Sequence, residues 1–300
     1  MDFNLTEEQL MIQQAARDFA QTELLPGVIE RDEHQKFPYE QVKKMGELGF
    51  LGMMVDPKYG GAGMDSVSYV LAMEEIAKVD ASAAVVMSVN NSLVCAGLEK
   101  FASEEQKQKY LVPLAKGEVI GAFALSEPEA GSDATSQKTT AIDMGDHYLL
   151  NGTKNWITNG GNAQYYIVIA QTDVEKKHKG INAFIVEKGW EGFVIGKKEE
   201  KLGIRGSDTH SLMFTDVKVP KENRIGEDGF GFNFAMAVLN GGRIGIASQA
   251  LGIASGAYEL ALKYAKERKA FGTEIINHQA IAFKLADMHV NIMAARMLCY

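Results

Sequence analysis

The feature that most constrains the fold is a change of hydrophobic period that occurs twice along the 300 residues. Before residue 118 and after residue 229, apolar side chains recur every three or four positions, as on the buried face of a helix. From Val119 to about Val219, short apolar runs are separated by turn residues, which is typical of strands and not of a βαβ array. We therefore expect a helical domain at residues 1–118, a β domain at 119–228 and a second helical domain that begins at 229.

Two capping boxes mark helix starts in the first domain. Thr6 is followed three residues later by Gln9, and Ser103 is followed in the same way by Gln106. The stretch at 81–98 is unusually apolar for a surface helix, so we expect it to be buried.

The middle domain carries turn signals at short intervals. Residues 139–142 and 147–150 flank Met144-Gly145-Asp146, a pattern that predicts a hairpin. The pair Asn151-Gly152 predicts a two-residue turn into a further strand at 154–157. We expect additional strands at 165–170, 181–186 and 211–219.

The last part is helical, with unusual glycine content and no stop signal. Each interior glycine of the helix at 230–266 costs about 1 kcal/mol relative to alanine, so a second helix or a ligand is expected close to its backbone. The final helix has apolar residues at spacings of three and four up to Cys299. Because no Gly, Asn or Pro follows, we expect these residues to belong to a longer protein whose further helices cover this face.

Composition and missing motifs exclude several classes of protein. A net charge of −8 leaves no basic surplus for nucleic acid. Cys95 and Cys299 are too far apart for a zinc or disulfide framework, and the first residues, 1–5, lack the pattern of a signal peptide. No apolar stretch reaches membrane-spanning length. We expect a cytoplasmic protein without nucleic-acid or membrane partners; GxGxxG, P-loop, HExxH and GxSxG motifs are missing.

Two stretches could bind a ligand. Residues 124–134 (ALSEPEAGSDA) read as a strand that enters a loop of small residues and hydroxyls, whose backbone N–H groups could bind a flat heterocycle or an anion. A polar connection between strands explains the same spacing. Residues 155–161 contain Trp156 near a strand end, where a tryptophan is more often a core residue than a cofactor contact.

Along its whole length, the chain resembles the acyl-CoA dehydrogenase family. Residues 124–136 match every constrained position of the family's N-terminal signature, and residues 87–93 are similar to the short-chain branch. Further matches lie at 151–154, 201–207, 242–245 and 268–272. The resemblance implies an α+β multidomain fold with an N-terminal α-helical domain, a central antiparallel β-barrel-like domain and an incomplete C-terminal helical bundle, usually assembled as a homotetramer.

The resemblance also implies FAD as cofactor and an acyl-CoA substrate. The positions implied to contact FAD in the same subunit are Phe123, Leu125, Ser126, Ser132, Trp156, Ile157 and Thr158. Ser126 is implied to meet the pyrimidine edge of the flavin, Thr158 its N5 atom, and Ser132 the CoA as well. Arg268, Phe271 and Gln279 are implied to hold the FAD of a neighbouring subunit. Asn240, where the family commonly has Asp, and Arg243 match the substrate-binding stretch.

The implied reaction is α,β-dehydrogenation of short-chain acyl-CoA to trans-2-enoyl-CoA in fatty-acid or butyrate metabolism, with an electron-transferring flavoprotein as partner. The usual base is a glutamate expected beyond Tyr300; in a few branches it occupies the position of Gly242 here. We therefore expect no catalytic base within residues 1–300. An oxidase of the same fold, acting on acyl-CoA or nitroalkanes, and a non-catalytic flavin- or acyl-CoA-binding relative remain alternatives.

Overall fold

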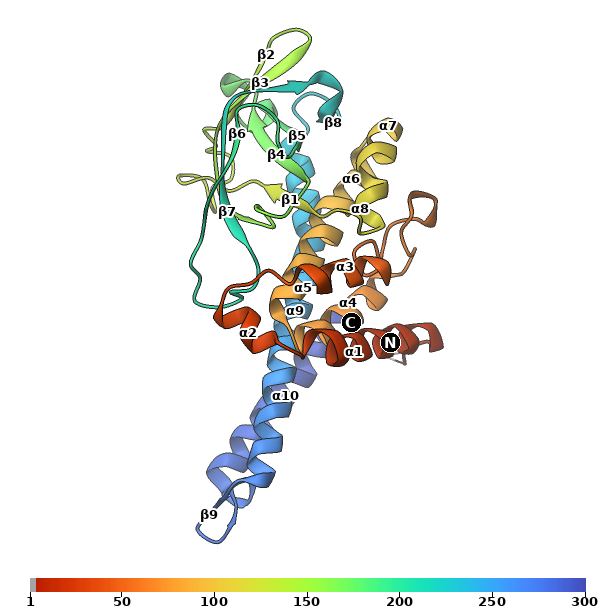
Figure 1. The fold of residues 1–300 in the computed structure, drawn as a ribbon, viewed down its shortest axis with the longest axis vertical. Coiled ribbons are helices and arrows are strands. Elements are labelled where there is room, and N and C mark those ends of the chain that lie inside the picture. Colours follow the sequence, from red (N-terminus) through yellow and green to blue (C-terminus); the bar gives the residue numbers. More distant parts are fainter. Residues whose placement is uncertain (1–3) are drawn as a thin grey trace.

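The computed structural model describes residues 4–300. A group of helices, a β-sheet and a rod made of two long helices are arranged so that the rod runs from beneath the sheet, past the helices and beyond them (Figure 1). Residues 1–3, on which the expectation of a missing signal peptide partly depends, lie outside the described residues.

The N-terminal part is helical, as expected, and both capping boxes form, at Thr6 and at Ser103. The expectation that no apolar stretch reaches membrane-spanning length is corrected: Ala81–Phe101 is apolar and long enough to cross a membrane by length and composition alone. Its most apolar window is 78% buried inside the protein, as expected for a core helix. The elements are α1 (Glu7–Phe19), η1 (Ala20–Leu24), α2 (Val28–Glu33), α3 (Tyr39–Glu47), η2 (Pro57–Tyr59), α4 (Ser66–Ala77), α5 (Ala81–Ser88), η3 (Val89–Cys95), α6 (Ala96–Phe101), α7 (Glu104–Gln106), η4 (Lys107–Leu111) and α8 (Val112–Ala115).

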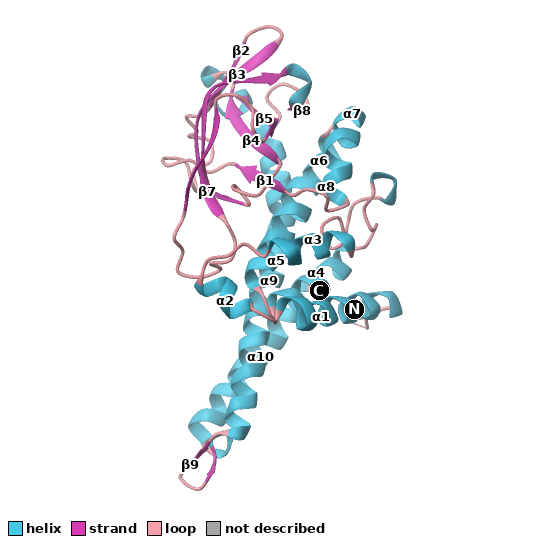
Figure 2. Ribbon diagram, viewed as in Figure 1, coloured by secondary structure: helices cyan, strands magenta, loops and turns pink. Residues whose placement is uncertain are grey.

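The middle part is one eight-stranded sheet with the order β6-β7-β3-β2-β4-β5-β8, to which β1 is added alongside β4 (Figure 2). The predicted hairpin is confirmed, because β2 pairs antiparallel with β3. The strands are β1 (Gly121–Ala124), β2 (Thr140–Asp143), β3 (His147–Thr158), β4 (Tyr165–Gln171), β5 (Ile181–Glu187), β6 (Phe193–Lys198), β7 (Thr209–Pro220) and β8 (Arg224–Ile225), with short 3-10 turns η5 (Val174–Gly180) and η6 (Lys221–Asn223).

Two expectations for this sheet are corrected. The described strands do not close into a barrel, and β4 pairs in parallel with both β1 and β2. The predicted turn at Asn151-Gly152 is wrong, because β3 runs through it and only shifts register there against β7. The side chain of Asn151 exchanges hydrogen bonds with Asp216 of β7, at 3.0 and 2.8 Å. Asn151 faces two residues of β7, Thr215 and Asp216, and Asp216 has a φ of 51°, so the bulge at this point lies on β7.

Helix α9 (Gly231–Glu267) explains the glycines of the last part. A Cβ on Gly252 would lie 2.5 Å from the Glu74 carbonyl oxygen of α4, and one on Gly245 would lie 2.7 Å from the hydroxyl of Tyr69. The expectation that a helix approaches this backbone closely is confirmed, and the neighbour is α4.

Helix α10 (Gln279–Cys299) returns along α9 after a tip formed by β9 (Lys269–Ala270), β10 (Thr273–Glu274) and η7 (Ile275–Asn277). Its apolar stripe is only partly covered: Leu285 and Ile292 are buried, whereas Met288 is 46% exposed. The predicted stripe consists of Ile281, Leu285, Met288, Ile292, Ala295 and Cys299.

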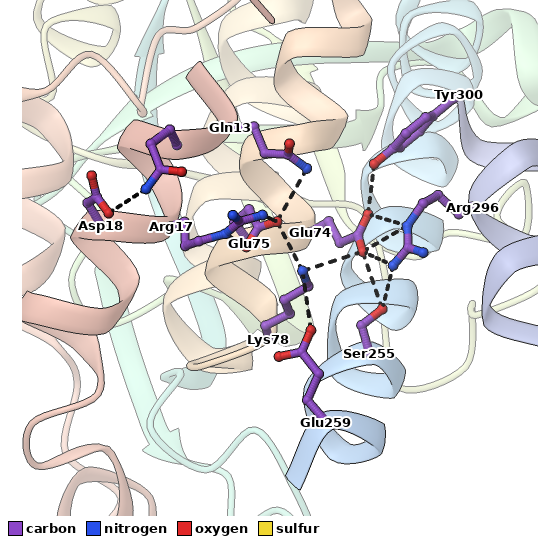
Figure 3. A network of polar contacts seen from close by, with 11 residues as sticks. Gln13, Arg17, Asp18, Glu74, Glu75, Lys78, Ser255, Glu259, Arg296 and Tyr300 are labelled. Carbon is purple, nitrogen blue, oxygen red and sulfur yellow. Dashed lines mark hydrogen bonds and ion pairs between the residues drawn. The ribbon is translucent and has the colours of Figure 1, made fainter. Parts of the chain in front are cut away.

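A polar network ties the end of α10 to the N-terminal helices (Figure 3). The buried Glu74 carboxylate accepts hydrogen bonds from Arg296 at 2.6 Å and from Tyr300 at 3.0 Å. The next residue, Glu75, is bound by Arg17 of α1 at 3.0 Å and by Lys78 at 3.0 Å. Helices α1, α4 and α10 are therefore fixed to one another through two adjacent carboxylates.

The three parts share a core. One hydrophobic cluster contains Leu98 of α6, Ile167 of β4 and Phe234 of α9. The segments that contain the predicted domain boundaries, 118/119 and 228/229, connect α8 to β1 and β8 to α9. The shared cluster packs against the elements on both sides of these connections. The sheet and the helices are therefore held in fixed positions relative to one another.

Candidate functional site

The loop that follows β1 is bound directly to strand β3. The backbone N–H of Asn155 donates to the Ser126 carbonyl over 2.9 Å, and the Lys154 ammonium donates to the Leu125 carbonyl over 2.9 Å. Ser126 and Trp156 therefore lie side by side, although they come from separate parts of the sequence. The two stretches singled out as possible ligand sites form one surface.

Trp156 faces away from the core. It is 56% exposed, and its φ of 57° is a left-handed conformation that is rare for bulky residues. The pairing of β3 with β7 shifts register between Lys154 and Ile157, and both of these residues are buried. Because of this bulge, Lys154 and Ile157 both face the core although they are three residues apart. Trp156 and Thr158, on either side of Ile157, point outward.

The end of β3 is fixed by a second set of polar contacts. Asn159, with a φ of 64°, donates from its side chain to the Gly121 carbonyl at the start of β1 over 3.0 Å. The Asp208 carboxylate accepts from the backbone N–H groups of Gly161 at 2.6 Å and Asn162 at 3.1 Å. These bonds hold the turn after Thr158 against both β1 and β7.

Behind the loop lies a buried ion pair. The Lys154 ammonium is 2.7 Å from a Glu127 carboxylate oxygen, and the two side chains are 0% and 2% exposed. Burial lowers the pKa of Lys154 to about 8, against the opposing attraction of Glu127. Burial raises the pKa of Glu127, but the charge and hydrogen bonds of Lys154 outweigh it, so this pKa lies below its ordinary range. Each group therefore favours the charged form of the other.

The other predicted residues of this region differ in exposure. Phe123 and Ile157 are buried, at 9% and 2%, so their side chains pack in the core and only their backbones can meet a ligand. Leu125, Ser126 and Thr158 are half-buried at the surface beside Trp156, and Ser132 is exposed on the loop.

The predicted substrate residues lie on α9. Arg243 donates to the Asn240 side chain over 2.7 Å, and both residues are exposed. Gly242, between them, is buried, and a Cβ there would lie 2.8 Å from a Leu93 methyl group. A side chain at that position would therefore have to displace Leu93.

The remaining predicted residues are far from this surface. Arg268, Phe271 and Gln279 lie at the tip between α9 and α10, at the opposite end of α9 from the sheet (Figure 1). All three are exposed, and Phe271 is 98% exposed. Within one chain, these three tip residues therefore do not lie near Trp156.

Sequence reasoning missed the residues that hold the site together, namely Glu127, Lys154, Asn159 and Asp208. One signal was available for Lys154. Tyr148 and Leu150 alternate as inward-facing residues of β3, and the same alternation places position 154 toward the core. A lysine at an inward position requires an acidic partner, and the neighbouring loop supplies Glu127.

The exposed indole, with the half-buried Ser126 and Thr158 on the same surface, suits a flat aromatic ligand with polar atoms at its rim. The residues thus fit a flavin ring. The chain belongs to the acyl-CoA dehydrogenase family: models of its N-terminal, middle and C-terminal domains match residues 6–118, 122–217 and 229–300. It is an FAD-dependent oxidoreductase that acts on the CH–CH bond of acyl-CoA.

Among individual members of the family, the chain is similar to short-chain enzymes. The short-chain specific acyl-CoA dehydrogenase of Clostridium acetobutylicum is 53% identical over 300 residues, which are 100% of this chain and 79% of the relative. The mouse mitochondrial short-chain enzyme is 50% identical over 99% of this chain and 72% of its own length. The solved butyryl-CoA dehydrogenase of Megasphaera elsdenii has a TM-score of 0.98 at 49% identity, covering 100% of this chain and 79% of the other. A chain solved in work on the electron transferring flavoprotein of Acidaminococcus fermentans has a TM-score of 0.99 at 51% identity, with the same coverage.

Proposed function

We propose that the flavin of this short-chain acyl-CoA dehydrogenase lies against the exposed indole of Trp156, with Ser126 and Thr158 at its polar edges. The observation that carries the proposal is the position of Trp156, which is 56% exposed and is held beside Ser126 by the adjacent Asn155 N–H. A tryptophan kept at the surface by a left-handed backbone is unfavourable unless a ligand covers it.

Each protein group then has a defined task. The indole offers an aromatic face for stacking, and the hydroxyls of Ser126 and Thr158 offer hydrogen bonds to the ring edge. Ser132 on the loop and the Asn240–Arg243 pair on α9 are the groups we assign to the acyl-CoA. Bound FAD supplies the oxidant for the β-hydrogen, while these residues align the thioester and exclude water from it.

The catalytic base is a separate part of the proposal. Among the described residues, the position before Arg243 is Gly242, which has no side chain to accept a proton. We expect residues 1–300 with added FAD to bind butyryl-CoA and yet to show at most trace reduction of the flavin. Anaerobic visible spectra after addition of butyryl-CoA test this, and strong bleaching would contradict it.

Substrate length is tested by binding. We expect butyryl-CoA to bind more tightly than octanoyl-CoA to the FAD-loaded protein, as the names of the relatives suggest for their own substrates. Isothermal titration with both thioesters, compared with free CoA, measures the preference. Equal affinities for all three would remove the short-chain assignment, and rapid reoxidation of dithionite-reduced flavin by oxygen would favour an oxidase.

We also propose a homotetramer, a cytoplasmic location and electron transfer to an electron-transferring flavoprotein. The chain described with the flavoprotein of Acidaminococcus fermentans supports the last of these. The exposed tip residues and the partly covered face of α10 support association with other subunits. Sedimentation at several protein concentrations, with and without FAD, tests the assembly.

A further inference from the structure

Lys154 has a complete set of partners inside the protein. Its ammonium group donates to the Leu125 carbonyl at 2.9 Å, to Glu127 at 2.7 Å and to the Gln137 side-chain carbonyl at 3.1 Å. An ammonium has three hydrogens, so these contacts satisfy it fully. All three acceptors belong to the one loop that follows β1.

Glu127 closes the other end of the same loop. Its carboxylate accepts from the backbone N–H groups of Lys138 at 2.6 Å and Thr139 at 3.1 Å. Gln137, which also contacts Lys154, donates to the Ala134 carbonyl at 2.8 Å. The buried pair therefore binds the loop where it leaves β1 and where it enters β2, and the exposed arc with Ser132 lies between.

Stability alone does not explain such a pair. Removing two charges from water costs several kcal/mol per ion, and well-packed apolar residues at such positions are often as stable or more so. A buried charge can orient and polarise a neighbouring peptide, which an apolar group cannot do. The Lys154 ammonium contacts the Leu125 carbonyl, and the Ser126 N–H lies at the other end of the same peptide unit.

We propose that Lys154 is a positioning residue for the flavin: its ammonium orients and polarises the Leu125–Ser126 peptide that faces the ring. A hydrogen bond to the carbonyl of a peptide strengthens its N–H as a donor. Asn155 fixes the next carbonyl, that of Ser126, at 2.9 Å, so the peptide is held on both sides. The inference rests on the proposed flavin site and assigns its polar edge to a charge behind the loop.

The test compares Lys154→Met with Lys138→Met, a matched control that removes an exposed lysine from the same loop. For Lys154→Met we expect FAD affinity to fall at least about ten-fold, the usual effect of losing an orienting contact behind a ligand site. We also expect the midpoint potential of the bound flavin to become more negative, because a nearby positive charge favours the reduced form. Lys138→Met should keep both values.

The single variant leaves the buried Glu127 without its partner and can destabilise the protein. The double variant Lys154→Met/Glu127→Gln removes both charges and keeps the test decisive in that case. Wild-type affinity and potential in either folded variant would overturn the proposal. Failure of both variants to show a cooperative unfolding transition would also overturn it, since the pair would then serve the fold. If the wild-type chain binds FAD but Trp156→Gly does not weaken binding, the proposed flavin site itself is wrong, independently of Lys154.

Discussion

At the scale of single residues, Trp156 has an unfavourable backbone conformation and an exposed side chain. Its φ of 57° is expected to cost about 1–3 kcal/mol, and its 56% exposure returns little of that through burial. A glycine would adopt the same backbone without strain. The proposed flavin contact gives a reason why an indole stands at this position.

We expect Trp156→Gly to leave the melting temperature unchanged or raised while FAD affinity falls by about two- to ten-fold, since stacking on an aromatic ring is worth about 0.5–1.5 kcal/mol. Differential scanning fluorimetry and flavin fluorescence titration measure the two effects. Trp156→Phe, which keeps an aromatic ring, is the control and should retain most of the affinity. A large fall in stability for Trp156→Gly would show that the indole is a core residue.

The contacts of the Glu75 carboxylate predict that the stability of the protein depends on pH. Burial raises its pKa, but the hydrogen bonds of Arg17 and Lys78 outweigh burial and hold the pKa below its ordinary range. Because the folded-state pKa is the lower one, this stabilisation is present above the unfolded value of about 4.3 and is lost as the pH falls below it.

We therefore expect Glu75→Gln to destabilise the protein by about 1–3 kcal/mol at pH 7 and by progressively less between pH 5 and pH 3. Urea unfolding across this pH range gives the comparison. Glu30→Gln is the control, since Glu30 and its partner Lys36 are 63% and 57% exposed and contribute little. A constant difference at every pH would mean that the carboxylate charge is not responsible.

Sequence reasoning singled out the residues now proposed to face the ligand, but it missed the residues that support them. Ser126 and Trp156 stood out because their motifs are local, and the structure places them together. Asn159 and Asp208 could not be found in the same way, because their contacts join the end of β3 to β1 and β7. Such contacts depend on the order of the strands, which turn signals do not specify.

At the scale of elements, the errors have a common origin. The predicted hairpin depends on neighbours in sequence and formed, whereas the Asn151-Gly152 turn failed because β7 pairs along the whole length of β3. The expected antiparallel, barrel-like sheet differs in two details, because β1 and β2 each pair with β4 in parallel and the sheet remains open. Long-range pairing thus overrode the local turn signal.

The glycines of α9 give a paired prediction. Gly252→Ala should destabilise the protein by about 1–3 kcal/mol, because the new methyl group would lie 2.5 Å from a backbone oxygen of α4. Gly241→Ala should stabilise it by up to about 1 kcal/mol, since nothing lies within 4 Å and alanine favours a helix. Chemical denaturation of both variants decides the matter. Equal effects would mean that α4 and α9 can separate without penalty.

At the scale of the whole molecule, the proposed FAD contacts fall at two ends of one rod. Helix α9 has 37 residues and is therefore about 55 Å long. Arg268 and Phe271 follow its C-terminal end, at the tip away from the sheet whose strand β3 carries Trp156 (Figure 1). If both sets bind one FAD, as proposed, two chains must contribute to each site.

Mixing two defective variants tests this sharing. Trp156→Gly and Arg268→Ala should each bind FAD weakly, yet a refolded equimolar mixture should regain about a quarter of the wild-type sites. Half of the pairs are mixed, and one of the two sites in each mixed pair combines an intact surface with an intact tip. Equilibrium dialysis counts the sites, and each variant refolded alone is the control. Recovery no greater than that of the separate variants would place the tip outside the cofactor site.

The unbroken course of α9 also limits how the length of this protein can change. Each residue turns a helix by about 100°, so one insertion between Arg243 and Arg268 would swing the whole tip away from its present direction. The shortest addition that nearly restores the direction is about seven residues, or two turns, and it moves the tip outward by about 10 Å. Substitutions can accumulate along this rod one at a time, whereas insertions and deletions are expected to be selected against almost entirely.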